Sequence, residues 1–378
     1  MIKNHDFTLG AAILSLLFAV PSGAAEVLTV TSPKNFQVVQ QDELGIGKIS
    51  ILGAAYESVE EVRYRISGKP LKGKLPEDWQ TAKLDPKAQS YRADLDLPAG
   101  GWYQLEISAN AQGKQVATSL VEKFGVGEVF IVAGQSNAGN YGSAKTTSLS
   151  GLVASFDGKS WSLAADPLRG AGGNSGSFIP SFGDGLHAKL QVPIGILPLA
   201  AGGTSVREWL PAGTRFAQQP TTGQNVKAVG NEFEAIGGLY GKLTAAIDST
   251  GKTGFRAVLW HQGESDAGQA RSGYPADRQI TGAQYAGFMK LLIDSSRKHA
   301  GWDIPWITAV TTYHSEADAQ DEEFRAAQQS LWKNGLAIQG PDTDELRKEY
   351  RAGVHFNEKG LKKHGELWAE HVLAWLNR

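Results

Sequence analysis

Alternating apolar and polar residues mark the first third of the chain as a series of strands. In residues 102–108 (WYQLEIS), the apolar Tyr103, Leu105 and Ile107 stand at every second position with polar residues between them. Because successive side chains of a strand point to opposite faces, this spacing predicts a half-buried strand. Further short apolar segments, separated by Gly, Pro and Asp, lie at residues 27–31, 49–52, 62–66 and 91–97. Short strands at these intervals predict a small Ig-like β-sandwich over residues 25–125.

From about residue 126 the pattern changes. Short, mostly apolar segments alternate with stretches in which apolar residues recur every three or four positions, as in a helix. Buried strands are predicted at residues 126–132, 192–199, 255–260 and 305–310. Strands that alternate with helices predict an α/β domain over residues 126–378, with a parallel sheet covered by helices on both faces. A functional site in such a sheet lies at the carboxyl ends of the strands.

Two of the intervening helices have clear sequence signals. Thr281 with Gln284 three residues later is typical of a capping box. The apolar residues that follow, at positions 285, 288, 289, 292 and 293, share one helical face. A last helix is predicted over residues 358–377, with its apolar face formed by Leu361, Leu367, Trp368, Val372 and Trp375.

The first residues have the pattern of an export signal. Lys3 is followed by an apolar run over residues 9–20 and by small residues at 21–25 (PSGAA). This order predicts a signal peptide over residues 1–24, and hence a periplasmic or secreted protein that leaves the membrane after cleavage. The alternative is a membrane anchor, although the run is shorter than the ~20 apolar residues of a membrane span.

Composition narrows the function classes. Of 378 residues, 41 % are hydrophobic and 20 % charged, which is typical of a folded chain with ample material for a core. The 37 basic and 39 acidic residues form no basic run, so nucleic acid is not an expected partner. The chain has no cysteine, so the exported fold must stand without disulfides.

Four unusual segments follow predicted strands or precede the last helix. They are residues 134–137 (GQSN), 200–205 (AAGGTS), 260–266 (WHQGESD) and 354–357 (VHFN). A serine on a tight glycine-supported turn exposes its hydroxyl, and paired glycines let a backbone N–H approach a ligand. Taken singly, each also has an ordinary interpretation: a turn, a solvated loop or a structural histidine.

Together the four segments resemble the SGNH (GDSL) hydrolase superfamily, and more closely the sialic acid-specific acetylesterases and carbohydrate esterase family six. Asp166-Pro167 and residues 177–180 (SFIP) also fit this pattern. The resemblance covers residue 126 to the C-terminus and not the N-terminal strands. It implies a three-layer, flavodoxin-like α/β fold and a serine esterase that removes O-acetyl groups from a sugar. The implied partner is an acetylated carbohydrate, and no cofactor or metal is implied.

The resemblance also implies roles for individual residues. Ser136 would be the nucleophile and His355 its general base. The N–H groups of Ser136 and Gly203 and the side-chain amide of Gln262 would form the oxyanion hole. Gln135 and Asn137, on either side of the nucleophile, are expected to bind substrate.

One position departs from the pattern. Many relatives have an aspartate three residues before the histidine, and this chain has Ala352 there. Either a backbone carbonyl orients the His355 ring, or a carboxylate arrives from elsewhere. Glu264 is the favoured carboxylate because it belongs to one of the four segments, whereas Glu349 is nearer in sequence.

The substrate signal is weaker than the catalytic one. Arg207 could pair with the carboxylate of a sialic acid, and Trp209 could stack on a sugar ring. Packing and surface charge are the alternative interpretation of both residues. O-acetylated sialic acid is therefore the first expected substrate, acetylxylan or another acetylated polysaccharide the second, and a non-catalytic glycan-binding protein a further alternative.

Overall fold

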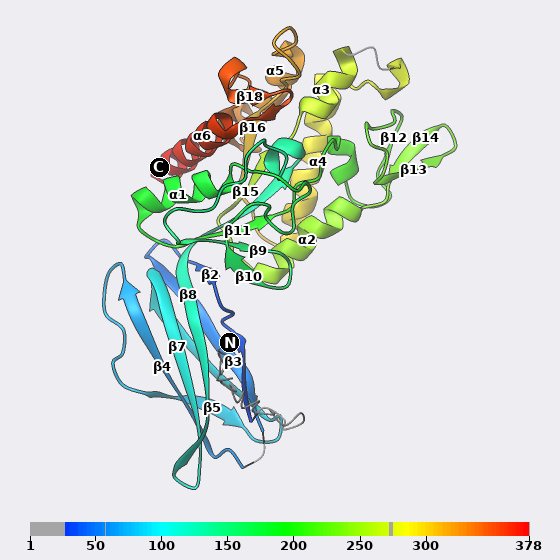
Figure 1. The fold of residues 1–378 in the computed structure, drawn as a ribbon. Coiled ribbons are helices and arrows are strands. Elements are labelled where there is room, and N and C mark those ends of the chain that lie inside the picture. Colours follow the sequence, from blue (N-terminus) through cyan, green and yellow to red (C-terminus); the bar gives the residue numbers. More distant parts are fainter. Residues whose placement is uncertain (1–26, 57, 272–274, 378) are drawn as a thin grey trace, which may run out of the picture.

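The computed structural model describes residues 27–56, 58–271 and 275–377. The predicted signal peptide, residues 1–24, lies outside these ranges. The antiparallel N-terminal strands form one lobe, and the helices surround a parallel sheet in the other (Figure 1). In the part of the chain that the structure describes, no helix is long and apolar enough to cross a membrane.

The N-terminal lobe confirms the predicted strands and adds others. Tyr103, Leu105 and Ile107 are fully buried, as their alternation predicts. Sequence reasoning missed β2 (Gln37–Gln40), β5 (Gln80–Asp85) and residues 114–125, which form the first part of β8. In their order across the sheet the antiparallel strands are β1 (Leu28–Ser32), β3 (Ile46–Ala55), β6 (Ser90–Pro98), β5, β4 (Glu61–Pro70), β7 (Gly100–Ala111) and β8 (Lys114–Gly134).

Strand β8 connects the two lobes. Its first part pairs antiparallel with β7, and residues 128–134 pair in parallel with β11 (Ile194–Pro198) and β15 (Ala257–His261). The strand therefore runs straight through the predicted boundary between residues 125 and 126. Residues 121–134 (VEKFGVGEVFIVAG) contain no Pro, Asn or Asp, so the sequence offers no strong turn signal at which a strand would end.

Among the described residues the parallel sheet has six strands, and the four that the sequence predicted form its centre. A short strand, β10 (Trp161–Leu163), adds antiparallel to the β9 edge. The strands β9 and β17 were not predicted. The order is β9 (Val153–Phe156), β11, β8, β15, β16 (Trp306–Val310) and β17 (Ile338–Asp342).

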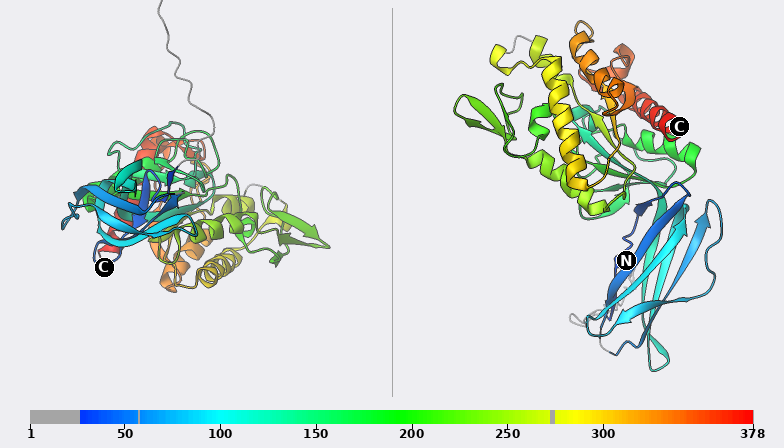
Figure 2. Two further views of the ribbon diagram at one scale, coloured as in Figure 1. Left: turned by 90° about the horizontal axis from the view of Figure 1, so that it is seen from below. Right: turned by 180° about the vertical axis from the view of Figure 1, so that it is seen from behind.

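Helices cover both faces of this sheet. Alternate residues of β8 point to opposite faces and pack into the apolar core on each side. Phe130 and Val132 belong to one apolar cluster with residues of α1 (Ile179–Leu190) and α6 (Glu358–Leu376). Val129 and Ile131 belong to a second cluster with residues of α2 (Gly238–Thr250), α4 (Gly282–Ala300) and α5 (Glu322–Lys333). Helices α1 and α6 are seen on one side of the sheet and α2 and α4 on the other (Figure 1, Figure 2).

The two predicted helices lie where the sequence places them. Thr281 caps α4, and the capping box with Gln284 is formed. Helix α6 begins after Asn357, whose side chain accepts from the Gly360 N–H. The remaining elements are α3 (Glu264–Arg271), the 3₁₀ turns η1 (Ser136–Ala138), η2 (Val206–Trp209), η3 (Ala276–Arg278) and η4 (Lys348–Tyr350), a three-stranded sheet of β12 (Arg215–Phe216), β13 (Val226–Val229) and β14 (Glu232–Ala235), and the pair β18 (Arg351–Ala352) and β19 (His355–Phe356).

Candidate active site

The turn after β8 is constrained by the neighbouring strand β15. Gly134 has φ +136°, and a Cβ atom there would lie 2.0 Å from the carbonyl oxygen of His261. Only glycine fits so close an approach. The chain then turns into η1, which begins at Ser136. The glycine of the GQSN segment thus places the serine at the carboxyl ends of β8 and β15.

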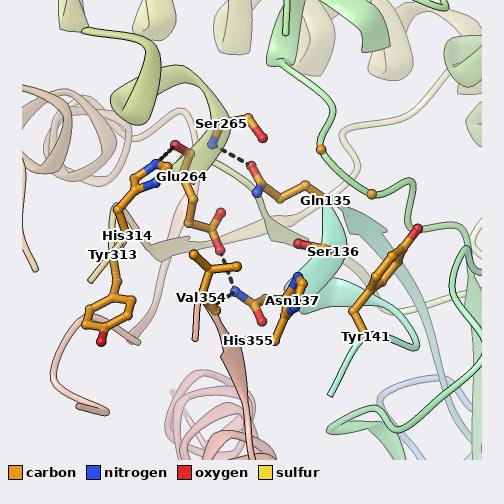
Figure 3. Close-up of a pocket in the computed structure, with 12 residues that line it drawn as sticks. Gln135, Ser136, Asn137, Tyr141, Glu264, Ser265, Tyr313, His314, Val354 and His355 are labelled. Atoms are coloured by element: carbon orange, nitrogen blue, oxygen red, sulfur yellow. Dashed lines mark hydrogen bonds between the residues drawn. The ribbon is translucent and has the colours of Figure 1, made fainter. Parts of the chain in front are cut away.

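A pocket of about 420 Å³ opens at this point. All four unusual segments contribute to its wall, so side chains from distant parts of the sequence converge there (Figure 3). Its lining residues are Gln135, Ser136, Asn137, Tyr141, Gly202, Gly203, Glu264, Ser265, Tyr313, His314, Val354 and His355.

Ser136 and His355 line this same pocket. Ser136 is 7 % exposed, and the His355 ring lies against Tyr141, with ring centroids 5.6 Å apart. Among the described residues no hydrogen bond joins the serine hydroxyl to the imidazole. Catalytic hydrogen bonds are often long without substrate and tighten in the substrate complex, so this placement is compatible with a nucleophile and its base.

The charge state of His355 suits a general base. Burial lowers the pKa of His355, the carboxylate of Glu264 raises it, and Arg351 lowers it, with a net lowering. The imidazole is therefore neutral at pH 7 and able to accept a proton. In the described ranges neither a carboxylate nor a backbone carbonyl is hydrogen-bonded to this ring, so neither predicted way of orienting it is formed as a direct contact.

Glu264 acts on His355 through space. It begins α3, and its Oε1 accepts a hydrogen bond from Asn137 Nδ2 at 2.9 Å and lies 3.3 Å from His261 Nε2. Burial opposes its ionisation, but the charge of His261 and these hydrogen bonds together lower the pKa of Glu264 to about 2. The other candidate, Glu349, is exposed and paired with Lys359, and it does not line the pocket.

The oxyanion role predicted for Gln262 does not fit the structure. Its amide is buried and donates to Asp266 at 2.8 Å and to the Thr204 carbonyl at 3.1 Å, and it does not line the pocket. The amide that does line the pocket is Gln135, whose Oε1 accepts from the Ser265 N–H at 3.0 Å. That bond fixes the amide plane. The Gln135 Nε2 donates to no other described residue.

Arg207 and Trp209 are also corrected by the structure. Both are fully buried, because they lie in η2 beneath the glycine loop. Arg207 pairs with Asp266 at 3.2 Å, and Trp209 donates to Thr204 Oγ1 at 3.0 Å. Neither side chain has surface left for a sugar. Asn137 does line the pocket, but its amide is engaged by Glu264 and by the Val354 carbonyl.

Several lining residues were missed by sequence reasoning. Tyr313 and His314 follow β16, and the His314 Nε2 binds the Glu264 carbonyl at 2.6 Å. Tyr141 follows η1 and contacts the base. The only feature of the sequence that could have indicated these residues is that each lies shortly after a predicted strand. Within the described residues, no group of three or more His, Asp or Glu side chains is arranged to hold a metal ion.

Comparison with known proteins identifies the family. Residues 126–374 match the family model described as carbohydrate esterase, sialic acid-specific acetylesterase. The chain belongs to this family. The match begins inside β8, so it includes all four segments of the pocket and excludes most of the N-terminal lobe. A search of curated proteins finds no match.

Solved structures are similar in fold at low sequence identity. A carbohydrate acetylesterase from Xanthomonas citri has a TM-score of 0.52 at 17 % identity, over 89 % of this chain and 72 % of that one. A protein from Arabidopsis thaliana has a TM-score of 0.45 at 20 % identity, over 65 % of this chain and 98 % of that one. A family two carbohydrate esterase from Cellvibrio japonicus has a TM-score of 0.35 at 10 % identity, over 93 % and 96 %. The first of these shows a shared fold that extends into the N-terminal lobe.

Proposed function

We propose that this carbohydrate esterase hydrolyses O-acetyl esters on a sugar, with Ser136 as nucleophile and His355 as general base. The observation that carries the proposal is the presence of both residues in one pocket at the carboxyl ends of β8 and β15. The lowered pKa of His355, caused mainly by burial, supports it, because a base must be neutral before it accepts a proton.

The chemistry follows from this placement. The Ser136 hydroxyl attacks the acetyl carbonyl carbon while His355 accepts the hydroxyl proton. His355 then returns the proton to the departing sugar oxygen, which leaves the acetyl group on Ser136. Water, activated by the same imidazole, hydrolyses the acetyl-enzyme to acetate. The backbone N–H groups of Ser136 and Gly203 are the proposed oxyanion donors, each worth about 2.7–4 kcal/mol of the barrier.

The pocket favours a sugar without a carboxylate. O-acetylated sialic acid was expected from Arg207, but that guanidinium is buried against Asp266. Among the described residues no arginine or lysine lines the pocket, so no such cation is placed there to pair with the carboxylate of a sialic acid. We therefore place acetylated polysaccharide such as acetylxylan ahead of O-acetylated sialic acid.

A panel of substrates tests both levels of the proposal. Acetate release is measured from acetylated xylan and from O-acetylated sialic acids, with wild-type protein and Ser136→Ala. We expect release from the neutral polysaccharide that is lost in the variant. Preference for sialic acid would overturn the substrate proposal alone. A protein that releases no acetate and is not labelled by an organophosphonate would be a glycan-binding protein instead.

The export signal and the N-terminal lobe complete the proposal. We propose that residues 1–24 direct the chain to the periplasm or the outside of the cell, and that residues 25–125 form an Ig-like accessory sandwich. The family match supports the second point, because it starts at residue 126. N-terminal sequencing of the protein from the native host tests the first: a mature start near residue 25 is expected.

A further inference from the structure

A line of buried side chains extends from Glu264 into the interior. His261 ends β15, and His364 and Trp368 lie one turn apart on α6. The His261 Nε2 is 3.3 Å from Glu264 Oε1, and its Nδ1 is 3.1 Å from His364 Nε2. The Trp368 Nε1 lies 3.0 Å from that same His364 nitrogen. All three side chains are 0–1 % exposed.

The hydrogen-bond chemistry of these groups fixes where the protons are. An indole N–H can only donate, so Trp368 donates to His364 Nε2, and that nitrogen carries a lone pair rather than a proton. The His261 Nδ1 lies 3.1 Å from the same nitrogen. A lone pair on Nδ1 would be repelled there, so Nδ1 carries a proton that shares the His364 lone pair with the indole N–H. The proton of neutral His364 is then on its own Nδ1, a buried atom with no hydrogen-bond partner among the described residues. A proton is thus assigned to His261 Nδ1.

The opposite nitrogen of His261 also needs a proton. It faces Glu264 Oε1, which already accepts from Asn137. A carboxylate oxygen only accepts, so a lone pair on His261 Nε2 would be repelled. From this geometry we infer that His261 is a doubly protonated imidazolium that serves as the buried counter-ion of Glu264 and as a positioning residue for the active site.

A charge on His261 acts on the ionisable groups packed around it. The charge of His261 lowers the pKa of Glu264, and after burial it lowers the pKa of His364, which stays neutral. The other ionisable groups that act on this line are Arg351 from β18 and Tyr285 from α4. Arg351 remains cationic, and burial raises the pKa of Tyr285, so that phenol stays neutral.

The pair sets how basic His355 is. An uncompensated carboxylate in the pocket would raise the pKa of the base and leave it protonated at neutral pH. The imidazolium of His261 offsets that charge while it holds the Glu264 carboxylate in place. The kinetic part of this inference rests on the proposed esterase function, whereas the charge of His261 does not.

Replacing Trp368 with Phe tests the inference. The change removes the indole N–H and keeps most of the ring volume. His364 Nε2 can then carry a proton and donate to His261 Nδ1, which allows a neutral His261 that still donates to Glu264. We expect loss of the imidazolium and a rise of about one unit in the pH midpoint of kcat/KM. Trp332→Phe is the matched control, because its indole N–H binds Thr308 Oγ1 instead.

The decisive readout is independent of activity. In full-length protein with ¹⁵N-labelled histidine, a ¹H–¹⁵N spectrum at pH 8 should show one ring with both nitrogens protonated, absent from His261→Gln. A neutral His261 ring in the wild-type spectrum would overturn the inference, even if Trp368→Phe did not fold. If Ser136→Ala kept full activity, the esterase proposal would be wrong, but this spectrum and the assignment of His261 would be unaffected.

Discussion

Asn137 and Glu264 are joined by a 2.9 Å hydrogen bond between their side chains, although 127 residues separate them in the sequence. The same Asn137 amide donates to the carbonyl of Val354, the residue before the general base. One side chain therefore ties together the turn after β8, the start of α3 and the segment that holds His355. Asn137 therefore holds these three segments together. Its amide nitrogen already donates to Glu264 and to Val354, so it has no N–H left for the substrate contact that the sequence had predicted.

Replacing Ser136 with Ala should abolish esterase activity and leave the fold intact, because only the attacking oxygen is removed. Turnover of p-nitrophenyl acetate is the measurement, with circular dichroism as the check on folding. Ser181→Ala is a suitable control, since that hydroxyl binds the Lys362 carbonyl away from the pocket. Activity within tenfold of wild type in Ser136→Ala would exclude Ser136 as the nucleophile.

The pH dependence should report His355. Its pKa lies below the usual histidine value of about 6.5, because burial disfavours the charged form. The base works when neutral, so kcat/KM should rise with pH through a midpoint below 6.5 and stay level at neutral pH. His355→Ala should lose this rate and profile. A His355→Ala enzyme that kept both would require another base.

Gln135→Glu tests whether Gln135, the amide that lines the pocket, supplies the oxyanion donor that the sequence assigned to Gln262. The new carboxylate keeps the oxygen that accepts from the Ser265 N–H but replaces the donor in the pocket, so kcat should fall about 10²-fold or more. Gln262→Ala should instead lower the free energy of unfolding by about 1–3 kcal/mol, since buried partners lose a donor. If kcat falls for Gln262→Ala and not for Gln135→Glu, the sequence-based choice was right.

Glu264→Gln should change the pKa of His355 more than the orientation of the His355 ring, because Glu264 makes no hydrogen bond to that ring among the described residues. Its carboxylate raises the pKa of His355, so the midpoint of kcat/KM should move to lower pH. The loss in kcat should stay well below the ~10⁴-fold cost of altering a carboxylate that holds the imidazole directly. A loss of that full size would show that Glu264 contacts His355 during turnover.

Ala352→Asp should increase the rate by supplying the carboxylate that this chain lacks. Ala352 and His355 are paired across β18 and β19, so their side chains share one face of the ladder. Ala352 is exposed, so the larger aspartate side chain fits there without displacing buried atoms. The comparison is kcat of Ala352→Asp against Ala352→Asn, which has the same shape without the charge. Equal rates in the two variants would contradict this expectation.

A chain that starts at Val126 should be less stable than the full protein, even though the family match begins there. It loses the pairing of β2 with residues 124–127 and the hydrogen bonds that Gln40 and Gln41 donate to Glu128. Thermal unfolding of the two chains is the measurement. Hydrolysis of a small acetyl ester at a temperature where the short chain is folded would show that the lobes are functionally separable.

Local pattern was enough for the elements and for the position of the chemistry. Alternation predicted the buried face of β7, and Thr281 with Gln284 predicted the start of α4. Gly134 could be recognised as the support of Ser136 from the GQSN turn, and the structure adds that the close approach of β15 permits no side chain there. The features that the sequence predicted depend on neighbours in sequence, which short-range physical chemistry specifies.

Side-chain direction was decided only by the tertiary structure. Gln135 and Gln262 each directly follow a strand of one sheet, and nothing in their sequence tells which amide turns toward the pocket. Arg207 is buried because Asp266, 59 residues later, supplies its counter-charge. His261 meets His364 across 103 residues. Such pairs depend on how α3 and α6 pack against the sheet. The periodicity of a single segment cannot predict that packing, because the partners are far apart in sequence.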